Sequence, residues 1–316
     1  MPVLPASEEA ISQAARALAL GEIVAFPTET VYGLGANARD AHAVTKVFAA
    51  KDRPRFNPLI VHVPDIAAAE TYATFEDTAR KLAEAFWPGP LSLVLPKRPA
   101  SGIADLVTAG LDTIALRAPN HAIAQALLKA TRLPIAAPSA NRSGRISPTT
   151  AEHVAAELGD LPAMILDGGP CARGLESTVV RVTGETPVLL RLGAVARQEI
   201  ETVLGHPIAL ADEDAPIASP GQLERHYAPN TPLRLDATEV EPDEALLAFG
   251  PSAPQGALTT INLSAAADLA EAATKLFASL RALDQSGASR IAVMPVPDQG
   301  LGEAINDRLR RAAKAR

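Results

Sequence analysis

The feature that most constrains the fold of this chain is an irregular alternation of short apolar runs with helical patterns. Apolar runs at residues 22–26, 58–63 and 91–95 predict buried strands, while residues 40–50 and 78–86 carry helical periodicity. The order of these elements does not follow the regular strand-helix-strand rhythm of an all-parallel sheet. We therefore expect an α/β fold with a twisted, mixed parallel and antiparallel sheet and surrounding helices.

A proline-rich stretch divides the chain into two parts. Residues 207–232 hold five prolines and few periodic signals, so they predict an extended linker. The part before it, residues 1–206, is predicted to be the larger domain. The part after it, residues 233–316, combines short strand patterns with two helical patterns, which predicts a second, smaller α/β domain.

Composition excludes several classes of protein. The net charge of −7 argues against a broad electrostatic grip on duplex DNA or an anionic membrane, and aromatic residues at 3% argue against stacking platforms for single-stranded nucleic acid. The single cysteine, Cys171, excludes an internal disulfide and a zinc knuckle. The N-terminus has no signal-peptide pattern and we predict no membrane span, so a cytoplasmic protein is expected.

Three segments carry the residues of a candidate site. Residues 26–35, FPTETVYGLG, supply hydroxyls and small residues, and residues 27–38 are predicted to form a loop rich in threonine and glycine. Residues 137–144, APSANRSG, can present backbone N–H groups to an anion. Between them stand Lys51 and Arg53, two positions apart, which point to the same side if the segment is extended. Together they are typical of a site that holds a nucleotide phosphate beside a small polar substrate. Each segment alone is equally compatible with a capped turn or a solvated helix end.

Standard nucleotide and hydrolase motifs are not present. The glycines from Gly33 to Gly35 fit a relaxed dinucleotide fingerprint, but six residues separate them from the preceding predicted strand, so we reject that interpretation. The sequence has neither a P-loop nor a nucleophile elbow. The six histidines show no metal-binding spacing, so no metal held by the protein is expected.

The motifs taken together resemble one family closely, the threonylcarbamoyl-AMP synthases of the YrdC-like superfamily in their longer, two-domain form. The matching stretches run in order through the first 230 residues and continue the three segments described above. They are FPTETVYGLG at 26–35, KDRPRFNPLIVHV at 51–63, WPGPLSLVL at 87–95, IALRAP at 114–119, APSANRSGRISPT at 137–149, LDGGP at 166–170, ESTVV at 176–180, LLRLG at 189–193 and SPGQLERHYAP at 219–229.

The resemblance implies a fold and a reaction. The fold is a YrdC-like mixed sheet plus a small Rossmann-like C-terminal domain, with the linker closing over the site. The reaction makes L-threonylcarbamoyl-AMP and pyrophosphate from L-threonine, bicarbonate or CO2, and ATP carried with Mg²⁺. It is the first step of tRNA threonylcarbamoyladenosine modification at position 37, and its product passes to a downstream tRNA threonylcarbamoyl-transfer complex. Direct tRNA binding is expected to be weak or absent.

The resemblance also assigns site residues. Lys51 and Arg53 are the implied catalytic cations. The threonine-binding residues implied by the motifs are Thr30, His62, Arg117, Ala137 and Ser177. The implied ATP-binding residues are Lys51, Arg53, Asn57, Thr113, Ser139, Asn141, Ser147, Arg191 and Tyr227.

Three alternatives stay open from the sequence. An RNA-binding module could use the same basic cavity, although the net charge and scarce aromatics weigh against it. A carbamoyl-phosphate-using hydrogenase-maturation enzyme has a similar middle domain, but it carries cysteine-rich zinc fingers ahead of that domain and this chain has one cysteine. A separate activity of the C-terminal part has no residues to support it, so a lid or interaction role is the better interpretation.

Overall fold

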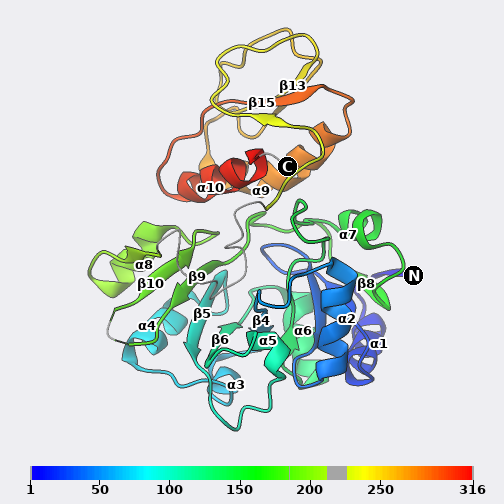
Figure 1. The fold of residues 1–316 in the computed structure, drawn as a ribbon, viewed down its shortest axis with the longest axis vertical. Helices are drawn as coiled ribbons and strands as arrows, with labels where there is room; N and C mark the ends of the chain where they lie inside the picture. The colour runs from blue at the N-terminus through cyan, green and yellow to red at the C-terminus, as the bar shows by residue number, and fades with distance from the viewer. Residues whose placement is uncertain (1, 185, 212–225, 315–316) are drawn as a thin grey trace.

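The computed structural model describes residues 2–184, 186–211 and 226–314, which form two α/β domains (Figure 1). The larger domain is built on an eleven-stranded sheet of order β1-β8-β2-β3-β7-β4-β6-β5-β9-β10-β11. Its strands are β1 (Val3–Pro5), β2 (Val24–Phe26), β3 (Gly33–Asn37), β4 (Ile60–His62), β5 (Leu91–Pro96), β6 (Thr113–Arg117), β7 (Ile135–Ala136), β8 (Met164–Asp167), β9 (Thr178–Arg181), β10 (Val188–Arg191) and β11 (Ala209–Leu210). Parallel neighbours such as β4 and β6 alternate with antiparallel ones such as β5 and β6, so the predicted mixed sheet is confirmed.

Helices cover both faces of this sheet. They are α1 (Glu8–Ala19), α2 (Ala41–Lys51), α3 (Ile66–Ala69), α4 (Asp77–Phe86), α5 (Asp105–Thr108), α6 (Ala122–Thr131), α7 (Ala151–Leu158) and α8 (Arg197–Leu204). Ser7 caps α1 and Asp40 caps α2 through side chains that accept backbone N–H bonds. Strand β2 shows the two faces: Val24 and Phe26 pack with α1 and α6, whereas Ala25 packs into the larger cluster on the other side.

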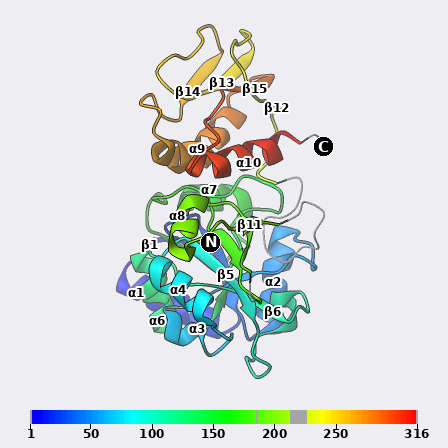
Figure 2. The same cartoon turned by 90° about the vertical axis from the view of Figure 1, so that its left-hand side faces the viewer.

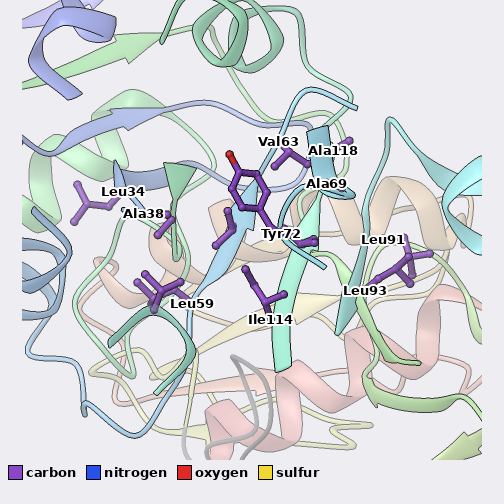
Figure 3. Packing of buried hydrophobic residues seen from close by; sticks show 14 of the residues in the cluster. Leu34, Ala38, Leu59, Val63, Ala69, Tyr72, Leu91, Leu93, Ile114 and Ala118 are labelled. Atoms are coloured by element: carbon purple, nitrogen blue, oxygen red, sulfur yellow. The ribbon is translucent and has the colours of Figure 1, made fainter. Parts of the chain in front are cut away.

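The same alternation in β4 and β6 positions the site. Val61, Ile114 and Leu116 belong to the larger core cluster, part of which Figure 3 shows around Ile114 and Tyr72. Their strand neighbours therefore point to the opposite face. His62 and Arg117 pair in register at the C-terminal ends of these two parallel strands. Core packing on one face thus fixes the direction of polar side chains on the other.

Strand β3 corrects a sequence prediction. Residues 27–38 were expected to form a loop because glycine and threonine are abundant there, yet Gly33–Asn37 pair with β2 and β7. Glycine is a poor strand former, but here its missing side chain is required. A Cβ on Gly35 would lie 2.7 Å from Ile135 Cγ2 and 2.8 Å from Phe26 Cε1. Because these glycines form a strand and do not open a helix, the rejection of a dinucleotide fingerprint is confirmed.

The smaller domain has a four-stranded, all-parallel sheet of order β12-β15-β13-β14. Its strands are β12 (Leu233–Arg234), β13 (Glu244–Ala248), β14 (Thr259–Asn262) and β15 (Arg290–Val293), and its helices are α9 (Leu269–Asp284) and α10 (Leu301–Ala313). Figures 1 and 2 show α9 and α10 between this sheet and the larger domain. A parallel sheet covered by helices confirms the expected Rossmann-like C-terminal domain.

The segment between the domains is described only in part. Residues Ala209–Leu210 pair with β10 as β11 and so extend the large sheet. Most of the predicted linker, residues 212–225, lies outside the described residues, so its closure over the site and the boundaries 1–206, 207–232 and 233–316 stay predictions. Within the described parts of the chain, we find no helix that is both long and apolar enough to cross a membrane.

Candidate active site

A cavity opens on the polar face of β4 and β6 and is closed on its far side by the residues that lead into the smaller domain. Most of its walls come from loops that follow strands, the usual position of ligand-binding residues in an α/β fold. The residues that line it are Thr28, Thr30, Val31, Gly33, Arg53, Ile60, His62, Arg117, Ala137, Pro138, Ser139, Glu176, Ser177, Arg191, His226 and Tyr227. The cavity therefore gathers segments that stand far apart in the sequence.

One end of the cavity is organised around Arg117. Its Nη1 donates to Thr30 Oγ1 at 2.9 Å, its Nε donates to the Gly89 carbonyl at 3.2 Å, and its Nη2 lies 2.6 Å from Glu29 Oε1. Burial raises the pKa of the Glu29 carboxyl, but the charge and hydrogen bond of Arg117 outweigh burial and hold that pKa below its usual value. A guanidinium has five donors, so these three contacts leave one donor on each terminal nitrogen for a ligand.

His62 lies beside Arg117 as a neutral imidazole. It is 4% exposed, and its ring meets Phe26 edge-on at 6.1 Å between centroids. Burial, and then the charge of Arg117, lower its pKa to about 3. Its Nδ1 has no protein hydrogen-bond partner within the described residues, although it is buried. This atom is free to meet a polar ligand atom.

The opposite end of the cavity is cationic. Arg53 donates from Nε to the Asn57 carbonyl at 3.1 Å and from Nη2 to the Pro58 carbonyl at 2.8 Å. Burial, and then the charge of Arg191, lower the pKa of Arg53 to about 9, so the guanidinium stays charged at neutral pH. Arg191 in turn donates from Nη2 to the Ser177 carbonyl at 2.7 Å. Two positioned guanidinium groups with like charge are suited to an anion that bridges them.

Lys51 does not follow Arg53 into the cavity. The expectation that both side chains point to one side assumed an extended segment, and this is wrong because Asp52 adopts a left-handed conformation, with φ of 51°, as it ends α2. Lys51 is 1% exposed, and its Nζ donates to the carbonyls of Ser139 and Asn141. Burial, and then the charge of Arg53, lower its pKa well below its usual value. Lys51 therefore holds the loop that forms one wall of the cavity.

The other predicted residues fall into two groups. Ala137, Ser139 and Ser177 line the cavity, and Ser177 Oγ lies 2.7 Å from Ser92 Oγ. The described residues that line the cavity do not include Asn57, Thr113, Asn141 or Ser147.

The predicted residues that do not line the cavity nevertheless lie near its cationic end. The register of β4 and β6 pairs Ile60 with Ala115, and continuing it by two residues brings Thr113 level with Pro58, which accepts from Arg53. Asn57 is fully buried, and neither its side-chain oxygen nor its nitrogen has a partner among the described residues. Asn141 donates to the Arg142 and Arg145 carbonyls, while its Oδ1 has no partner in the same part of the chain.

Tyr227 and His226 reach the cavity from the start of the smaller domain. Their rings meet edge-on at 4.0 Å between centroids, and Tyr227 Oη and His226 Nδ1 are buried without a hydrogen-bond partner in the described segments. Burial, followed by the charges of Lys51, Arg53, Arg308 and Arg191, lowers the pKa of His226 well below its usual value. Four cations thus converge on one neutral ring pair.

Sequence reasoning missed several residues of this site. Glu29 stood inside the quoted FPTETVYGLG motif, but no spacing rule joins it to Arg117, which lies far along the chain. Glu176 lines the cavity and accepts from Ser147 Oγ at 2.5 Å. Arg308 comes from α10 of the smaller domain and contacts Glu176 at 3.0 Å. Glu176 begins the quoted stretch ESTVV, and His226 was quoted within HYAP, in both cases without a role. The quoted motifs were thus the available signal for Glu29, Glu176 and His226, and the sequence offered none for Arg308.

Comparison with known proteins identifies the family. The family model described as Telomere recombination matches residues 16–193, and the model described as Threonylcarbamoyl-AMP synthase, C-terminal domain, matches residues 195–314. Threonylcarbamoyl-AMP synthase of Bacillus subtilis is 42% identical over 332 residues, covering 99% of this chain and 95% of that protein. The chain belongs to the threonylcarbamoyl-AMP synthase family.

Further relatives of this family support the same conclusion. Threonylcarbamoyl-AMP synthase of Pyrococcus abyssi is 41% identical over 310 residues, with 93% of this chain and 91% of that protein covered. The crystal structure of P. abyssi Sua5 complexed with L-threonine has a TM-score of 0.90 and 39% identity, and the match covers 97% of this chain and 95% of that one. The family and the fold inferred from the sequence, those of the two-domain threonylcarbamoyl-AMP synthases, are therefore confirmed.

Proposed function

We propose that this protein synthesises threonylcarbamoyl-AMP in the cavity described above, with threonine at the Arg117 end and ATP at the Arg53 end. The protein is a nucleotidyltransferase that carries out the first step of tRNA threonylcarbamoyladenosine modification, as its family membership establishes. L-threonine, bicarbonate and ATP are joined, and threonylcarbamoyl-AMP, pyrophosphate and water are formed.

The observation that carries this assignment is a set of buried polar atoms around one cavity that have no hydrogen-bond partner among the described residues. They are the side-chain amide of Asn57, His62 Nδ1, Asn141 Oδ1, His226 Nδ1 and Tyr227 Oη. A buried polar group without a hydrogen bond costs about 1–3 kcal/mol. Such a cluster, placed between Arg117 and a pair of cations, supports a polar ligand that supplies the missing partners.

The Arg117 end suits an amino acid. The two remaining donors of Arg117 form a fork for the threonine carboxylate, and the ion pair with Glu29 keeps that fork in position. Neutral His62, Thr30 and Ser177 offer hydrogen bonds to the threonine hydroxyl and amine, and the backbone of Ala137 closes the wall. The pair of one cation and one anion leaves this end nearly charge-balanced, which suits a zwitterion.

The chemistry needs no protein nucleophile. Bicarbonate takes up a proton and releases water, which gives CO2. The threonine ammonium loses a proton, its nitrogen lone pair forms a bond to the carbon of CO2 as one C–O π bond breaks, and loss of a second proton from that nitrogen leaves a carbamate. One carbamate oxygen then attacks the α-phosphorus of ATP, the bond from that phosphorus to the bridging oxygen breaks, and pyrophosphate leaves. Holding the two reactants in line contributes about 7–11 kcal/mol to lowering such a barrier. Catalysis is therefore positioning together with stabilisation of developing phosphate charge.

The Arg53 end suits the polyphosphate. Arg53 and Arg191 are already fixed by backbone carbonyls, so little conformational freedom is lost when they bind phosphate oxygens. Lys51 adds charge beneath the loop of Ser139 and Asn141 and orients that loop toward the nucleotide. Mg²⁺ would enter with ATP as part of the substrate and would neutralise part of the phosphate charge. In the described ranges, no group of three or more His, Cys, Asp or Glu residues could hold a metal ion.

The remaining nucleotide contacts follow from position. Asn57 and Thr113 lie at the end of β4 and β6 where Arg53 approaches, and Ser147 is tied to the wall through Glu176. Tyr227 covers the cavity on the same side. We assign these residues to the adenosine and phosphates of ATP, as the family resemblance implies.

The product sets the expected partners. An acyl-adenylate is reactive toward water, so a downstream tRNA threonylcarbamoyl-transfer complex must take it directly or after short diffusion. This protein then needs no strong tRNA affinity of its own, in agreement with its net charge of −7. We propose the cytoplasm as the compartment, because ATP, threonine and tRNA meet there.

The test is pyrophosphate release by the purified protein with ATP, Mg²⁺ and bicarbonate, with and without L-threonine, together with mass detection of the adenylate. The proposal expects release that depends on both threonine and bicarbonate. A folded protein that binds ATP without such release would overturn it and favour the RNA-binding alternative. In that case RNA affinity independent of threonine and ATP would be measured next.

A further inference from the structure

One fully buried, charged side chain of the smaller domain reaches across the domain interface. Arg308 of α10 is 0% exposed. Its Nε donates to Glu176 Oε2 at 3.0 Å, its Nη2 to the Leu192 carbonyl at 2.7 Å, and its Nη1 to Asp307 Oδ2 at 2.5 Å. All three guanidinium nitrogens therefore have a separate partner, two of which belong to the larger domain.

The same guanidinium lies against the ring of Tyr227. The Arg308 carbon Cζ is 4.9 Å from the ring centroid, within the range of a cation–π contact. Tyr227 also stacks on Phe277 of α9, with 5.5 Å between centroids and 24° between planes. Its backbone has φ of 64°, a conformation that non-glycine residues keep only when their surroundings hold them. Both helices of the smaller domain thus hold this one residue.

The two acceptors in the larger domain belong to the walls of the cavity. Glu176 lines the cavity, and Leu192 follows directly on Arg191. The two segments are pressed together: Ala194 N donates to the Glu176 carbonyl at 2.9 Å, and a Cβ on Gly193 would lie 2.4 Å from that same carbonyl oxygen. Arg308 spans this junction from outside and fixes both segments relative to Tyr227.

We propose that Arg308 is a positioning residue for the nucleotide end of the cavity, so that the smaller domain is part of the active site and not an appended module. The proposal rests on the proposed function in one respect, the assignment of the Arg53 and Tyr227 end to ATP. Arg308 does not line the cavity, and it acts through Glu176, Leu192 and Tyr227. Arginine is required because one planar group meets three acceptors and a ring at once, whereas a lysine ammonium is a point charge.

The interface also offers a matched control. Arg197 of α8 donates from Nε and Nη2 to Glu303 of α10, at 3.1 and 2.8 Å. This ion pair joins the same two domains through the same helix, but neither residue lines the cavity. If the contacts of Arg308 only hold the domains together, substitutions of Arg308 and Arg197 should have similar effects on ATP kinetics. If Arg308 positions the nucleotide end, only its substitution should change those kinetics.

The experiment compares Arg308→Lys with Arg197→Lys in the full chain and measures pyrophosphate release against ATP and against threonine, together with the melting temperature. Displacement of a site by about 1 Å can cost about 100-fold in rate, so we expect Arg308→Lys to raise the KM for ATP at least about tenfold. The KM for threonine should stay within about twofold, because the hydrogen bonds that Arg308 makes among the described residues do not involve Arg117, Glu29 or Thr30. Arg197→Lys should leave both values within about twofold.

Two further variants keep the outcome decisive. If Arg308→Lys does not fold, Asp307→Asn removes the negative charge of one partner of Arg308 at a less buried position and should raise the KM for ATP by about threefold. In a Tyr227→Leu background, the effect of Arg308→Lys on that KM should largely disappear, since the two act as a unit.

Unchanged ATP kinetics in folded Arg308→Lys, or in Asp307→Asn, overturn the proposal. If Arg53→Gln is also without effect, the ATP assignment itself fails; if only Arg53→Gln has an effect, this inference alone fails.

Discussion

The two ends of the cavity are built on different principles. The Arg117 end lies within the larger domain, at the ends of β4 and β6, and its cation is paired with Glu29 at 2.6 Å. The Arg53 end draws on both domains and brings like charges near one another. Burial, and then the charge of Arg191, lower the pKa of Arg53, and burial followed by four cations lowers that of His226. Arg117 is thus paired directly with one carboxylate, whereas the Arg53 end gathers several cations beside Glu176.

This difference follows the charge of the proposed substrates. A zwitterionic amino acid is best received by a fork whose own charge is already compensated, since excess charge would attract other anions. A polyphosphate is best received by several cations held close together, and positioned guanidinium groups supply them at the cost of mutual repulsion. Variants at each end should therefore fail in different ways.

The largest effect is expected at the Arg117 end. Arg117→Ala should lower the free energy of unfolding by about 3–5 kcal/mol, because it leaves the buried Glu29 charge unpaired. Threonine-dependent pyrophosphate release should be lost as well. Denaturant titration and the release assay measure the two effects separately.

A double variant separates stability from binding. Arg117→Met with Glu29→Gln removes both charges and should recover most of the lost stability, while threonine-dependent release stays absent. If Arg117→Ala is as stable as the unaltered protein, the ion pair does not organise the Arg117 end. The two ends of the cavity would then not differ in the way described above.

A smaller effect is expected at the cationic end. Arg53→Gln should reduce kcat/KM for ATP by about 100-fold, in the range found when one donor to developing charge is removed. Stability should change little, since relief of repulsion from Arg191 offsets the lost hydrogen bonds. The matched control is Arg55→Gln, an exposed arginine two positions away, which should keep ATP kinetics within about twofold. Equal losses in the two variants would point to general electrostatics and not to a positioned contact.

The third prediction concerns acid stability. The pKa of His62 in the folded protein is about 3, below its unfolded value of about 6.5. The unfolded chain therefore binds the extra proton, and the contribution of His62 is fully present above pH 6.5 and is lost as the pH falls toward 3. Between pH 7 and 4.5 the loss should be about 2–3 kcal/mol. Urea titrations of His62→Gln across this range should show a shallower decline, and an identical decline would contradict the prediction.

The smallest effect concerns selectivity at the Arg117 end. Serine differs from threonine by one methyl group, and a pocket discriminates such a difference by about 1–3 kcal/mol. Serine should therefore be a poor but detectable substrate, whereas valine, which lacks the hydroxyl, should be rejected more strongly. Mass detection of the adenylates at saturating amino acid tests this, and undetectable turnover of serine would show an additional source of discrimination.

Much of the fold could be predicted because local patterns carry it. Strand β5, Leu91–Pro96, was predicted at residues 91–95, since a short apolar run is a local signal of a buried strand. Strand β3 was missed because its glycines signal a turn, and only the approach of Phe26 and Ile135 makes them necessary. The shared direction of Lys51 and Arg53 was wrong because a single left-handed residue, Asp52, separates them.

The sequence by itself determined the family, the mixed sheet, the second α/β domain and most residues of the cavity, because motifs and periodicity are local properties. Only the tertiary structure decided which groups pair. Glu29 with Arg117, Lys51 with the carbonyls of Ser139 and Asn141, and Arg308 with Glu176 join positions about 90 to 130 residues apart. Such pairings depend on where packed strands and helices bury a charged side chain. The spacing of residues along the chain does not show which partner that side chain meets.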